Sequence, residues 1–259
     1  MMNGNVNLED LIGDIETNLV GRNVHFRESM TSTNVVAKKL AEDGAADGTV
    51  VVAGKQTAGR GRYGRSWFSP AGSISMTVIL RPDRPVAAPV ASAIGTVAAC
   101  GAIELNTPLS PRIMWPNDVF VNGRKVAGVL AEASSYLLIG IGMNVNVKEK
   151  EFPKDLRETA TSLSEELGRK AEPSKLLGSL FLELDSLYTT IAVGETSILD
   201  AEWKSHSATL GRQVVVSENG SSYEGRAIDV SVEEGLVLET HEGARKIFPP
   251  DSSTLVRTA

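Results

Sequence analysis

The chain has 259 residues, of which 42% are hydrophobic and 22% charged, as is typical of a soluble globular protein of one or two domains. Its 26 basic and 32 acidic residues give a net charge of −6, which argues against broad, non-specific nucleic-acid binding. The single cysteine, Cys100, excludes an internal disulfide and any four-thiolate metal site.

The N-terminal stretch, residues 1–16, is acidic and has no apolar core of signal-peptide length. No apolar run in the chain approaches the roughly 20 residues that span a bilayer. We therefore expect a cytoplasmic protein that does not enter a membrane.

The first elements in the chain predict buried strands and helices of an α/β domain. Helical spacing covers 35–42, after a polar Ser-Thr-Asn triplet that is typical of a helix N-cap. Apolar, β-branched runs at 49–54 and 73–80 predict buried strands. The alanine-rich stretch 88–105 predicts a buried helix, in which Cys100 is expected to be a small core residue.

A hairpin and a further strand are predicted next. Strand candidates 118–122 and 125–132 are joined by Asn-Gly, a strong hairpin signal. Another strand is expected at 136–141, continued by 144–147.

The C-terminal third changes first to helix and then to short strands. Pro173 opens a helix with an apolar stripe from Leu176 to Ile191, which we interpret as core. Short strands with glycine turns follow; they are expected at 213–217, 225–230, 236–239 and 246–248. The expected fold is therefore α/β (α+β). A mixed, mainly antiparallel sheet with flanking helices occupies 1–207, and a small SH3-like β-barrel occupies 208–259.

The segment Lys55–Pro70 (KQTAGRGRYGRSWFSP) carries the strongest functional signal. Five basic residues and no acid occur between Lys55 and Pro82 in a chain that is acidic overall. Alternating glycines and arginines predict a mobile loop whose amides and charges bind an anion such as a phosphate. The segment also matches G-x-G-x-x-G, but a strand follows it instead of a helix, which argues against a dinucleotide site.

Three further motifs are weaker when taken singly. WPND at 115–118 is followed by Lys125, a charge on an apolar strand that needs a carboxylate or phosphate partner. Alone, Asp118 is better explained as a turn or cap residue, and Lys125 is equally a strand end at the surface. In GIGMNVN at 140–146, two glycines on one face of a strand leave room for a flat ligand. The triplet Ser32–Asn34 serves as an N-cap and is still free to meet a ligand.

Together these motifs resemble the biotin–protein ligase family. The matching segments are Ser32-Thr33-Asn34, Gln56 with GRGRYGRSWFSP, WPND, GRKVAGVLAE at 123–132, and GIGMNVN, in the family's order. The resemblance implies a two-step reaction: biotin and ATP give biotinyl-5′-adenylate, and a lysine of a biotin carboxyl carrier domain then takes the biotinyl group. It also implies Mg²⁺. Because exposed strand edges in such a fold commonly pair, we expect a homodimer. With too few residues ahead of the catalytic region for a DNA-binding domain, we expect no specific DNA binding.

The resemblance implies a role for each matching residue. Arg62, Lys125 and Asp118 would be catalytic, and Asp118 would help to place the metal. Biotin would be bound by Ser32, Thr33, Asn34, Gln56, Gly59, Arg60, Arg62, Lys125, Gly128 and Gly140. ATP or the adenylate would be bound by Arg62, Trp67, Asn117, Lys125, Gly142 and Asn144.

The chain departs from the family pattern at Met114, where a lysine is usual, and at Pro249–Ser253, where a Gly-Glu-type turn is usual. Three alternatives remain at this point. A lipoate or octanoyl transferase shares the fold, the arginines and aromatics of the loop suit an RNA-binding module, and Met114 suits a biotin sensor without turnover.

Overall fold

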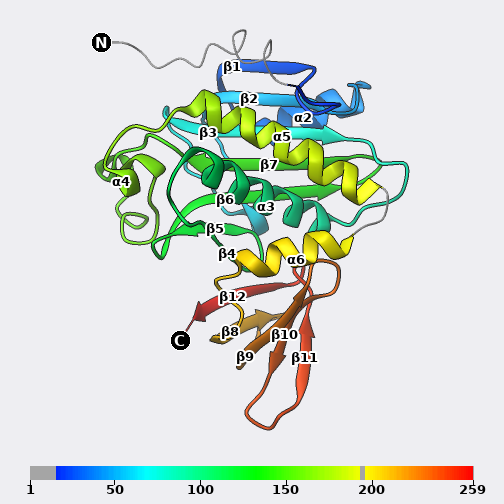
Figure 1. Ribbon diagram of the computed structural model, residues 1–259, viewed down its shortest axis with the longest axis vertical. Coiled ribbons are helices and arrows are strands. Elements are labelled where there is room, and N and C mark those ends of the chain that lie inside the picture. Colours follow the sequence, from blue (N-terminus) through cyan, green and yellow to red (C-terminus); the bar gives the residue numbers. More distant parts are fainter. Residues whose placement is uncertain (1–15, 193–195, 259) are drawn as a thin grey trace.

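The computed structural model describes residues 16–192 and 196–258 (Figure 1). The prediction that the N-terminal stretch is not a signal peptide concerns residues 1–16, and 1–15 lie outside these ranges.

A seven-stranded sheet forms the larger part of the molecule, in the order β1-β2-β3-β7-β6-β5-β4. Its strands are β1 (Val24–Met30), β2 (Thr49–Gln56), β3 (Ser73–Leu80), β4 (Arg112–Met114), β5 (Asp118–Val121), β6 (Arg124–Ala133) and β7 (Leu137–Asn144). Among the pairings of these strands β1 with β2 is parallel and the rest are antiparallel, which confirms the predicted mixed, mainly antiparallel sheet.

The centre of this sheet is covered on both faces. Every residue of β3 and β7 is buried, which explains why their sequences are continuous apolar and small runs without alternation. The predicted continuation of the last strand over 144–147 is wrong, because the chain leaves the sheet after Asn144. Asn146 instead bonds both the N–H and the C=O of Ala171 through its side chain, which turns the chain toward the helices.

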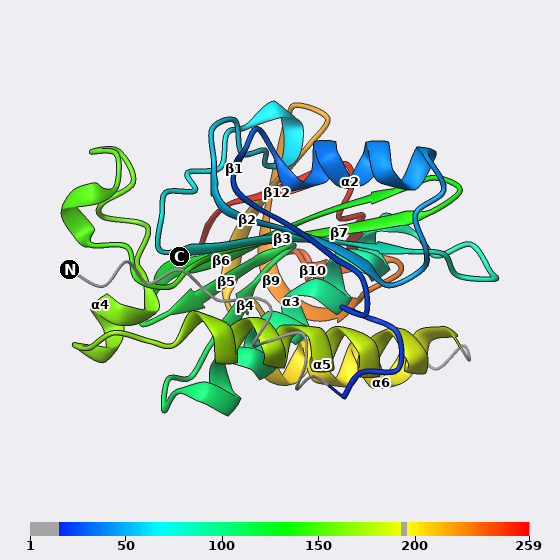
Figure 2. The same cartoon turned by 90° about the horizontal axis from the view of Figure 1, so that it is seen from above.

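Helices cover the two faces unequally (Figure 2). The helix α2 (Thr33–Glu42) packs on one face against β2, β3 and β7. The opposite face is covered by α3 (Ala88–Asn106), α5 (Pro173–Ala192) and α6 (Thr196–His206), with α3 between the sheet and α5. Three short helical turns lie in the connections: η1 (Arg62–Gly64), η2 (Glu149–Glu151) and α4 (Leu163–Leu167).

The helix α3 corrects one statement made from the sequence. It has 19 residues and is apolar enough to cross a membrane by length and composition, so an apolar run of nearly spanning length does exist. In the structure 67% of that window is buried against the sheet and α5, as in the core helix of a soluble protein. Cys100 in this helix is fully buried, and its burial raises the pKa of its thiol, which confirms the interpretation as a core residue.

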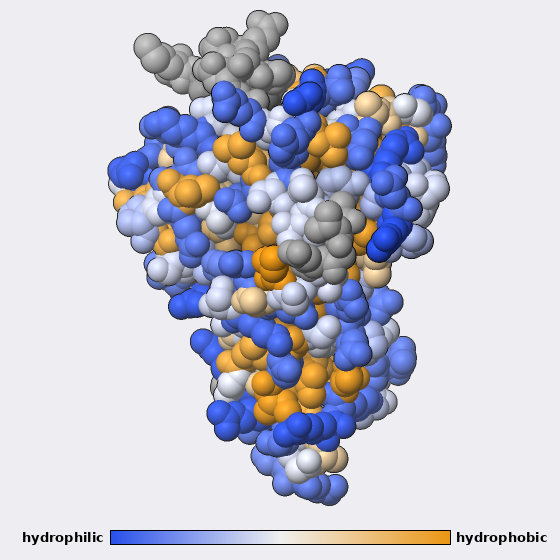
Figure 3. Space-filling view, turned by 45° about the vertical axis from the view of Figure 1, so that its right-hand side comes forward, coloured by the Kyte–Doolittle hydropathy of each residue, from blue (hydrophilic) through white to orange (hydrophobic). Residues whose placement is uncertain are grey.

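A second, five-stranded antiparallel sheet follows α6 and lies beneath the first in Figure 1. Its strands are β8 (Gln213–Glu218), β9 (Ser221–Ser231), β10 (Gly235–Glu239), β11 (Arg245–Phe248) and β12 (Ser253–Thr258), in the order β11-β10-β9-β8-β12. The small C-terminal β module is thus confirmed, with β12 as a strand that the sequence pattern did not reveal. Figure 3 shows apolar side chains gathered on this module at the bottom of the view.

Candidate active site

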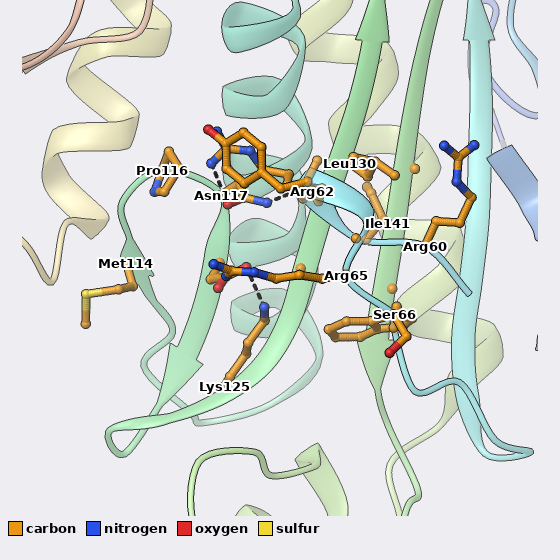
Figure 4. Close-up of a pocket in the computed structure, with 18 of the residues that line it drawn as sticks. Arg60, Arg62, Arg65, Ser66, Met114, Pro116, Asn117, Lys125, Leu130 and Ile141 are labelled. Atoms are coloured by element: carbon orange, nitrogen blue, oxygen red, sulfur yellow. Dashed lines mark hydrogen bonds and ion pairs between the residues drawn. The ribbon is translucent and has the colours of Figure 1, made fainter. Parts of the chain in front are cut away.

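A cavity of about 520 Å³ opens where the loop between β2 and β3 crosses the sheet (Figure 4). Its walls come from the start of α2, the end of β2, the loop itself, the β4–β5–β6 segment, the middle of β7 and the strand β12. Residues far apart in sequence therefore meet here, including all of the segments that the sequence motifs singled out.

Backbone hydrogen bonds organise the loop. Trp67 N–H donates to the carbonyl of Gly59 at 2.9 Å, and Gly61 N–H donates to that of Arg65 at 2.7 Å. A methyl group on Gly59 would overlap the carbonyl oxygen of Trp67, so glycine is needed there for the two arms of the loop to cross. At the tip, Tyr63 adopts the left-handed conformation (φ 56°), which is uncommon for a residue with a side chain.

Positive charge dominates the cavity although the chain is acidic overall. Four cations line it (Arg60, Arg62, Arg65 and Lys125) against one carboxylate, Asp118. Within the described part of the chain, Arg60 and Arg65 make no side-chain hydrogen bond or salt bridge and remain available to an anion. Such a concentration of donors and cations is suited to a phosphate chain or a carboxylate.

Arg62 is a partly buried cation of the loop, whereas Arg60 and Arg65 are exposed. Its guanidinium donates to the carbonyl of Pro250, to Asn117 Oδ1 at 3.4 Å and to the Tyr63 hydroxyl at 2.8 Å. Burial lowers the pKa of Arg62 below its ordinary value, although an arginine remains protonated at neutral pH. Because its partners are uncharged oxygens, an incoming anion would be a stronger partner than any of them.

Lys125 and Asp118 form an ion pair at the mouth of the hairpin. Lys125 Nζ lies 2.7 Å from Asp118 Oδ1, and both side chains are 29% exposed. The counter-charge expected for Lys125 is thus a carboxylate on the neighbouring strand. The same ammonium lies 5.3 Å from the centroid of the Trp67 ring, within cation–π range.

The Trp67 indole lies over the glycines of the sheet. A methyl group on Gly142 would overlap Nε1 of the indole, and one on Gly128 would approach the ring to 3.2 Å. The room above Gly142, which the sequence suggested for a flat ligand, therefore holds this side chain. Among the described residues the indole N–H has no hydrogen-bond partner although it is buried.

The other end of the cavity is formed by the uncharged residues Ser32, Thr33, Asn34 and Gln56, which we call the neutral end; the first three are buried and Gln56 is partly buried. Ser32 occupies the N-cap position of α2 without a capping hydrogen bond from its side chain. The free N–H of Thr33 instead donates to Gln56 Oε1 at 2.8 Å, so the glutamine side chain satisfies the helix end. The opposite end, with Arg62, Arg65 and Lys125, we call the cationic end.

Most residues predicted for the site line this one cavity. They are Ser32, Thr33, Asn34, Gln56, Arg60, Arg62, Trp67, Asn117, Asp118, Lys125, Gly128, Gly140 and Gly142. Gly59 and Asn144 lie outside its lining. Asn144 is buried and donates to the carbonyl of Thr161, whose N–H in turn donates to the carbonyl of Lys125. It thus supports the backbone of Lys125 from behind.

Sequence reasoning missed several lining residues. Arg65 and Tyr63 lie in the loop motif but were not singled out as contacts, whereas Thr254–Val256 come from β12, far along the chain. Met114 lines the cavity, with its sulfur 3.6 Å from the Thr209 hydroxyl. In Figure 4 its side chain points away from the cationic groups.

The unusual segment Pro249–Ser253 contacts the loop. Besides the Arg62 contact with Pro250, the Tyr63 hydroxyl lies 2.9 Å from the carbonyl oxygen of Asp251 and donates to it. The C-terminal module thus closes one side of the cavity through backbone carbonyls.

The cavity has too few metal-ligating side chains to hold a metal ion by protein groups alone. Within the described ranges, no group of three or more His, Cys, Asp or Glu side chains lies close enough together to hold an ion. The single carboxylate Asp118 fits Mg²⁺ that brings most of its oxygen ligands with it, as phosphates and water.

Comparisons with known proteins find relatives over most of the chain. The model of the biotin/lipoate A/B protein ligase family matches residues 26–146. The chain is 34% identical over 245 residues to a bifunctional ligase/repressor BirA of Bacillus subtilis, covering 92% of this chain and 75% of that protein. It is 32% identical over 231 residues to a biotin–[acetyl-CoA-carboxylase] ligase of Paracoccus denitrificans, covering 84% and 94%.

A solved structure is similar over nearly the whole chain. It is a biotin protein ligase from Aquifex aeolicus in complex with biotin and ATP, 27% identical, with a TM-score of 0.80. The match covers 92% of this chain and 100% of that one, so it includes both sheets.

Proposed function

This chain belongs to the biotin/lipoate A/B protein ligase family, and on that premise we propose that it is an ATP-dependent biotin–protein ligase. It activates biotin as biotinyl-5′-adenylate and transfers the biotinyl group to a lysine of a biotin carboxyl carrier domain. The observation that carries the proposal is a single cavity with a neutral, hydrogen-bonding end and a cationic end. Such a cavity matches an uncharged ring system on one side and a triphosphate on the other.

The cationic end meets the main difficulty of the first step. A carboxylate oxygen of biotin attacks the α-phosphorus of ATP, a P–O bond to the β-phosphate breaks, and pyrophosphate leaves. Two anions must approach each other, so Arg62 and Lys125 neutralise charge as it develops. Asp118 holds Lys125 in place through their 2.7 Å ion pair.

The remaining predicted contacts divide between the two ends of the cavity. We assign biotin to Ser32, Thr33, Asn34, Gln56, Arg60, Gly128 and Gly140, with Gly59 shaping the loop above them. We assign the nucleotide to Arg62, Trp67, Asn117, Lys125 and Gly142. Asn144 acts on the nucleotide indirectly, through the Thr161 contact that supports Lys125.

Magnesium enters this proposal as the complex with ATP. Mg²⁺ takes few protein ligands when a substrate supplies phosphate oxygens, so one carboxylate, Asp118, is enough to help place it. Bound there, the ion withdraws charge from the phosphates during adenylation.

In the second step the amine of the acceptor lysine attacks the acyl carbon of the adenylate, and AMP leaves. The loop and the Pro249–Ser253 segment limit the access of water to this mixed anhydride. We further propose a catalytic unit of residues 1–207, a C-terminal SH3-like unit of residues 208–259, a cytoplasmic location, and a homodimer formed through a sheet edge such as that of β1. The absence of specific DNA binding stays a prediction.

Biotin-dependent exchange of labelled pyrophosphate into ATP tests the first step without knowledge of the acceptor. We expect exchange with biotin and none with lipoate or octanoate at the same concentration. Exchange with lipoate alone would reassign the substrate within the family. Biotin binding without exchange would identify a sensor and contradict the ligase.

A further inference from the structure

Thr77 is a buried residue at which the hydrogen bonds of the neutral end converge. It lies at the middle of β3, is completely inaccessible to solvent and does not line the cavity. Its hydroxyl oxygen is nevertheless 2.8 Å from Thr33 Oγ1 and 2.8 Å from Asn34 Oδ1. Two cavity residues are therefore bound to one hydroxyl behind them.

The Asn34 carboxamide has a fixed orientation. Its Nδ2 donates to the carbonyl of Leu130 at 3.3 Å and to Glu132 Oε1 at 3.1 Å, so Oδ1 must be the atom that faces Thr77. Gly140 stands opposite Thr77 in the ladder, and a methyl group there would overlap Asn34 Oδ1. The glycine thus makes the space into which the carboxamide fits.

Counting protons then fixes the Thr33 hydroxyl. A threonine hydroxyl has one proton, and a carboxamide oxygen can only accept. Thr77 therefore donates to Asn34 Oδ1 and accepts the Thr33 proton at 2.8 Å, a shorter contact than the 3.3 Å between Thr33 Oγ1 and Gln56 Oε1. The Thr33 oxygen keeps free lone pairs and no free proton, so toward a ligand it is purely an acceptor.

Gln56 has the complementary polarity. Its Oε1 accepts the N–H of Thr33 at 2.8 Å, which leaves the two N–H bonds of Nε2 as donors. An acceptor at Thr33 and a donor at Gln56 match the N–H and C=O of a cyclic urea. This is the polar part of biotin.

We propose that Thr77 is a positioning residue for the biotin end of the cavity, because it fixes the hydroxyl of Thr33 as an acceptor and holds Asn34 in place. The inference rests on the proposed function and goes beyond it, since Thr77 touches no substrate. Loss of the Thr77 hydroxyl would release the Thr33 proton to a ligand or to the more distant Gln56 Oε1, and would leave Asn34 Oδ1 buried without a donor.

The chain offers a matched control at Thr49 in the neighbouring strand β2. This threonine is 1% exposed, and its hydroxyl has no hydrogen-bond partner among the described residues. Thr49→Val and Thr77→Val therefore make the same change at two buried positions of one sheet. They differ in whether the hydroxyl has partners.

The experiment measures biotin binding by titration calorimetry and steady-state KM values for biotin and ATP with the full chain. We expect Thr77→Val to weaken biotin binding and raise its KM about 10- to 100-fold, as for an unpaired buried polar group, with the KM for ATP within about twofold. Thr77→Ser, which keeps the hydroxyl, restores biotin binding, and Thr49→Val leaves it unchanged. Thr77→Ala repeats the deletion should the valine variant fail to fold.

A second measurement separates hydrogen-bond polarity from packing. Biotin methylated at either urea nitrogen should bind more weakly than biotin to the wild type. This loss of affinity should be smaller in Thr77→Val, because the Thr33 hydroxyl is no longer fixed as an acceptor. Wild-type affinity in a folded Thr77→Val variant would overturn the inference, as would a serine variant as weak as the valine one. If the wild-type chain bound no biotin, the proposed function itself would fail, and this inference with it.

Discussion

The two ends of the cavity are built in opposite ways. At the neutral end the polar groups are buried or partly buried and come from the start of α2 and the end of β2. Thr77 bonds Thr33 and Asn34, and Thr33 bonds Gln56. At the cationic end the charged groups come from a loop and a hairpin, are partly exposed, and include Arg65 without a salt bridge among the described residues. Neutral groups must be arranged before a ligand arrives, because a buried polar atom without a partner is costly. Cations remain hydrated until an anion replaces the water.

Removal of Arg62 should affect the cationic end most. Arg62→Ala should slow adenylation about 10²- to 10³-fold, because a half-buried cation that faces the developing anion is lost. Single-turnover formation of biotinyl-adenylate measures this rate. Arg84→Ala, an exposed arginine outside the cavity, is the control and should leave the rate unchanged. An unchanged rate in Arg62→Ala would remove this arginine from the mechanism.

Lys125 tests whether its ion pair serves catalysis or stability. Lys125→Ala should lower the adenylation rate roughly 10- to 100-fold, with a melting temperature close to that of the wild type, because partly exposed ion pairs contribute little to stability. The control is Lys204→Ala. Lys204 Nζ lies 2.8 Å from Asp229 Oδ1, and this ion pair is outside the cavity lining. Normal turnover in Lys125→Ala would mean that this lysine is only a strand end at the surface and has no role in catalysis.

Gly142 tests whether the Trp67 indole needs the bare backbone beneath it. In Gly142→Ala the new methyl group displaces the indole, so the KM for ATP should rise about 10-fold while biotin affinity stays near wild type. The control is Gly101→Ala in α3, where the methyl group meets only the flexible end of Glu183. If Gly142→Ala changed the KM for ATP and the affinity for biotin equally, the indole would contribute to binding at both ends of the cavity.

Ionic strength should distinguish the two ends without any mutation. Between about 0.05 M and 0.5 M salt, the KM for ATP should rise roughly fivefold, because screening weakens attraction between partly exposed charges. The biotin dissociation constant, measured in the absence of ATP, should change far less. Parallel changes would show that charge governs both ends.

Met114 should give the smallest effect. Met114→Lys adds a cation at the cavity wall and should lower the KM for ATP about two- to threefold, as expected of a partly exposed charge. Met114→Leu, which adds no charge, is the control. An unchanged KM for ATP in Met114→Lys would mean that the new lysine side chain points toward Thr209, as the methionine does, and away from the nucleotide.

Buried strands were easier to predict from the sequence than exposed or very short ones. The strand 73–80 was located correctly because all eight residues are buried and the apolar run has the length of the strand. β1 was not predicted, because an edge strand with five exposed residues, VHFRESM, has no apolar pattern. β4, with three residues, is too short to show any periodicity.

The site residues were predictable where they lie close together in the sequence. The glycine–arginine loop and the hairpin with Lys125 have unusual composition within a few residues. Thr77 and Thr254–Val256 have no such signal, because they reach the cavity through sheet pairing and through the docking of the C-terminal module. Asn144 shares the strand face of Gly140 and Gly142, yet it lies beyond the cavity because β7 ends there.

The position of Trp67 gives the protein an intrinsic optical signal. Of the chain's three tryptophans, Trp203 is 2% exposed in the core and Trp115 is 3% exposed at the cavity wall, whereas Trp67 lines the cavity, is partly exposed and has a cation 5.3 Å away. A nucleotide that covers or displaces the Trp67 indole changes its fluorescence, whereas Trp203, which does not line the cavity, contributes a constant background. Occupancy of the site can therefore be followed in the unlabelled wild-type chain, in real time and in either half of the reaction.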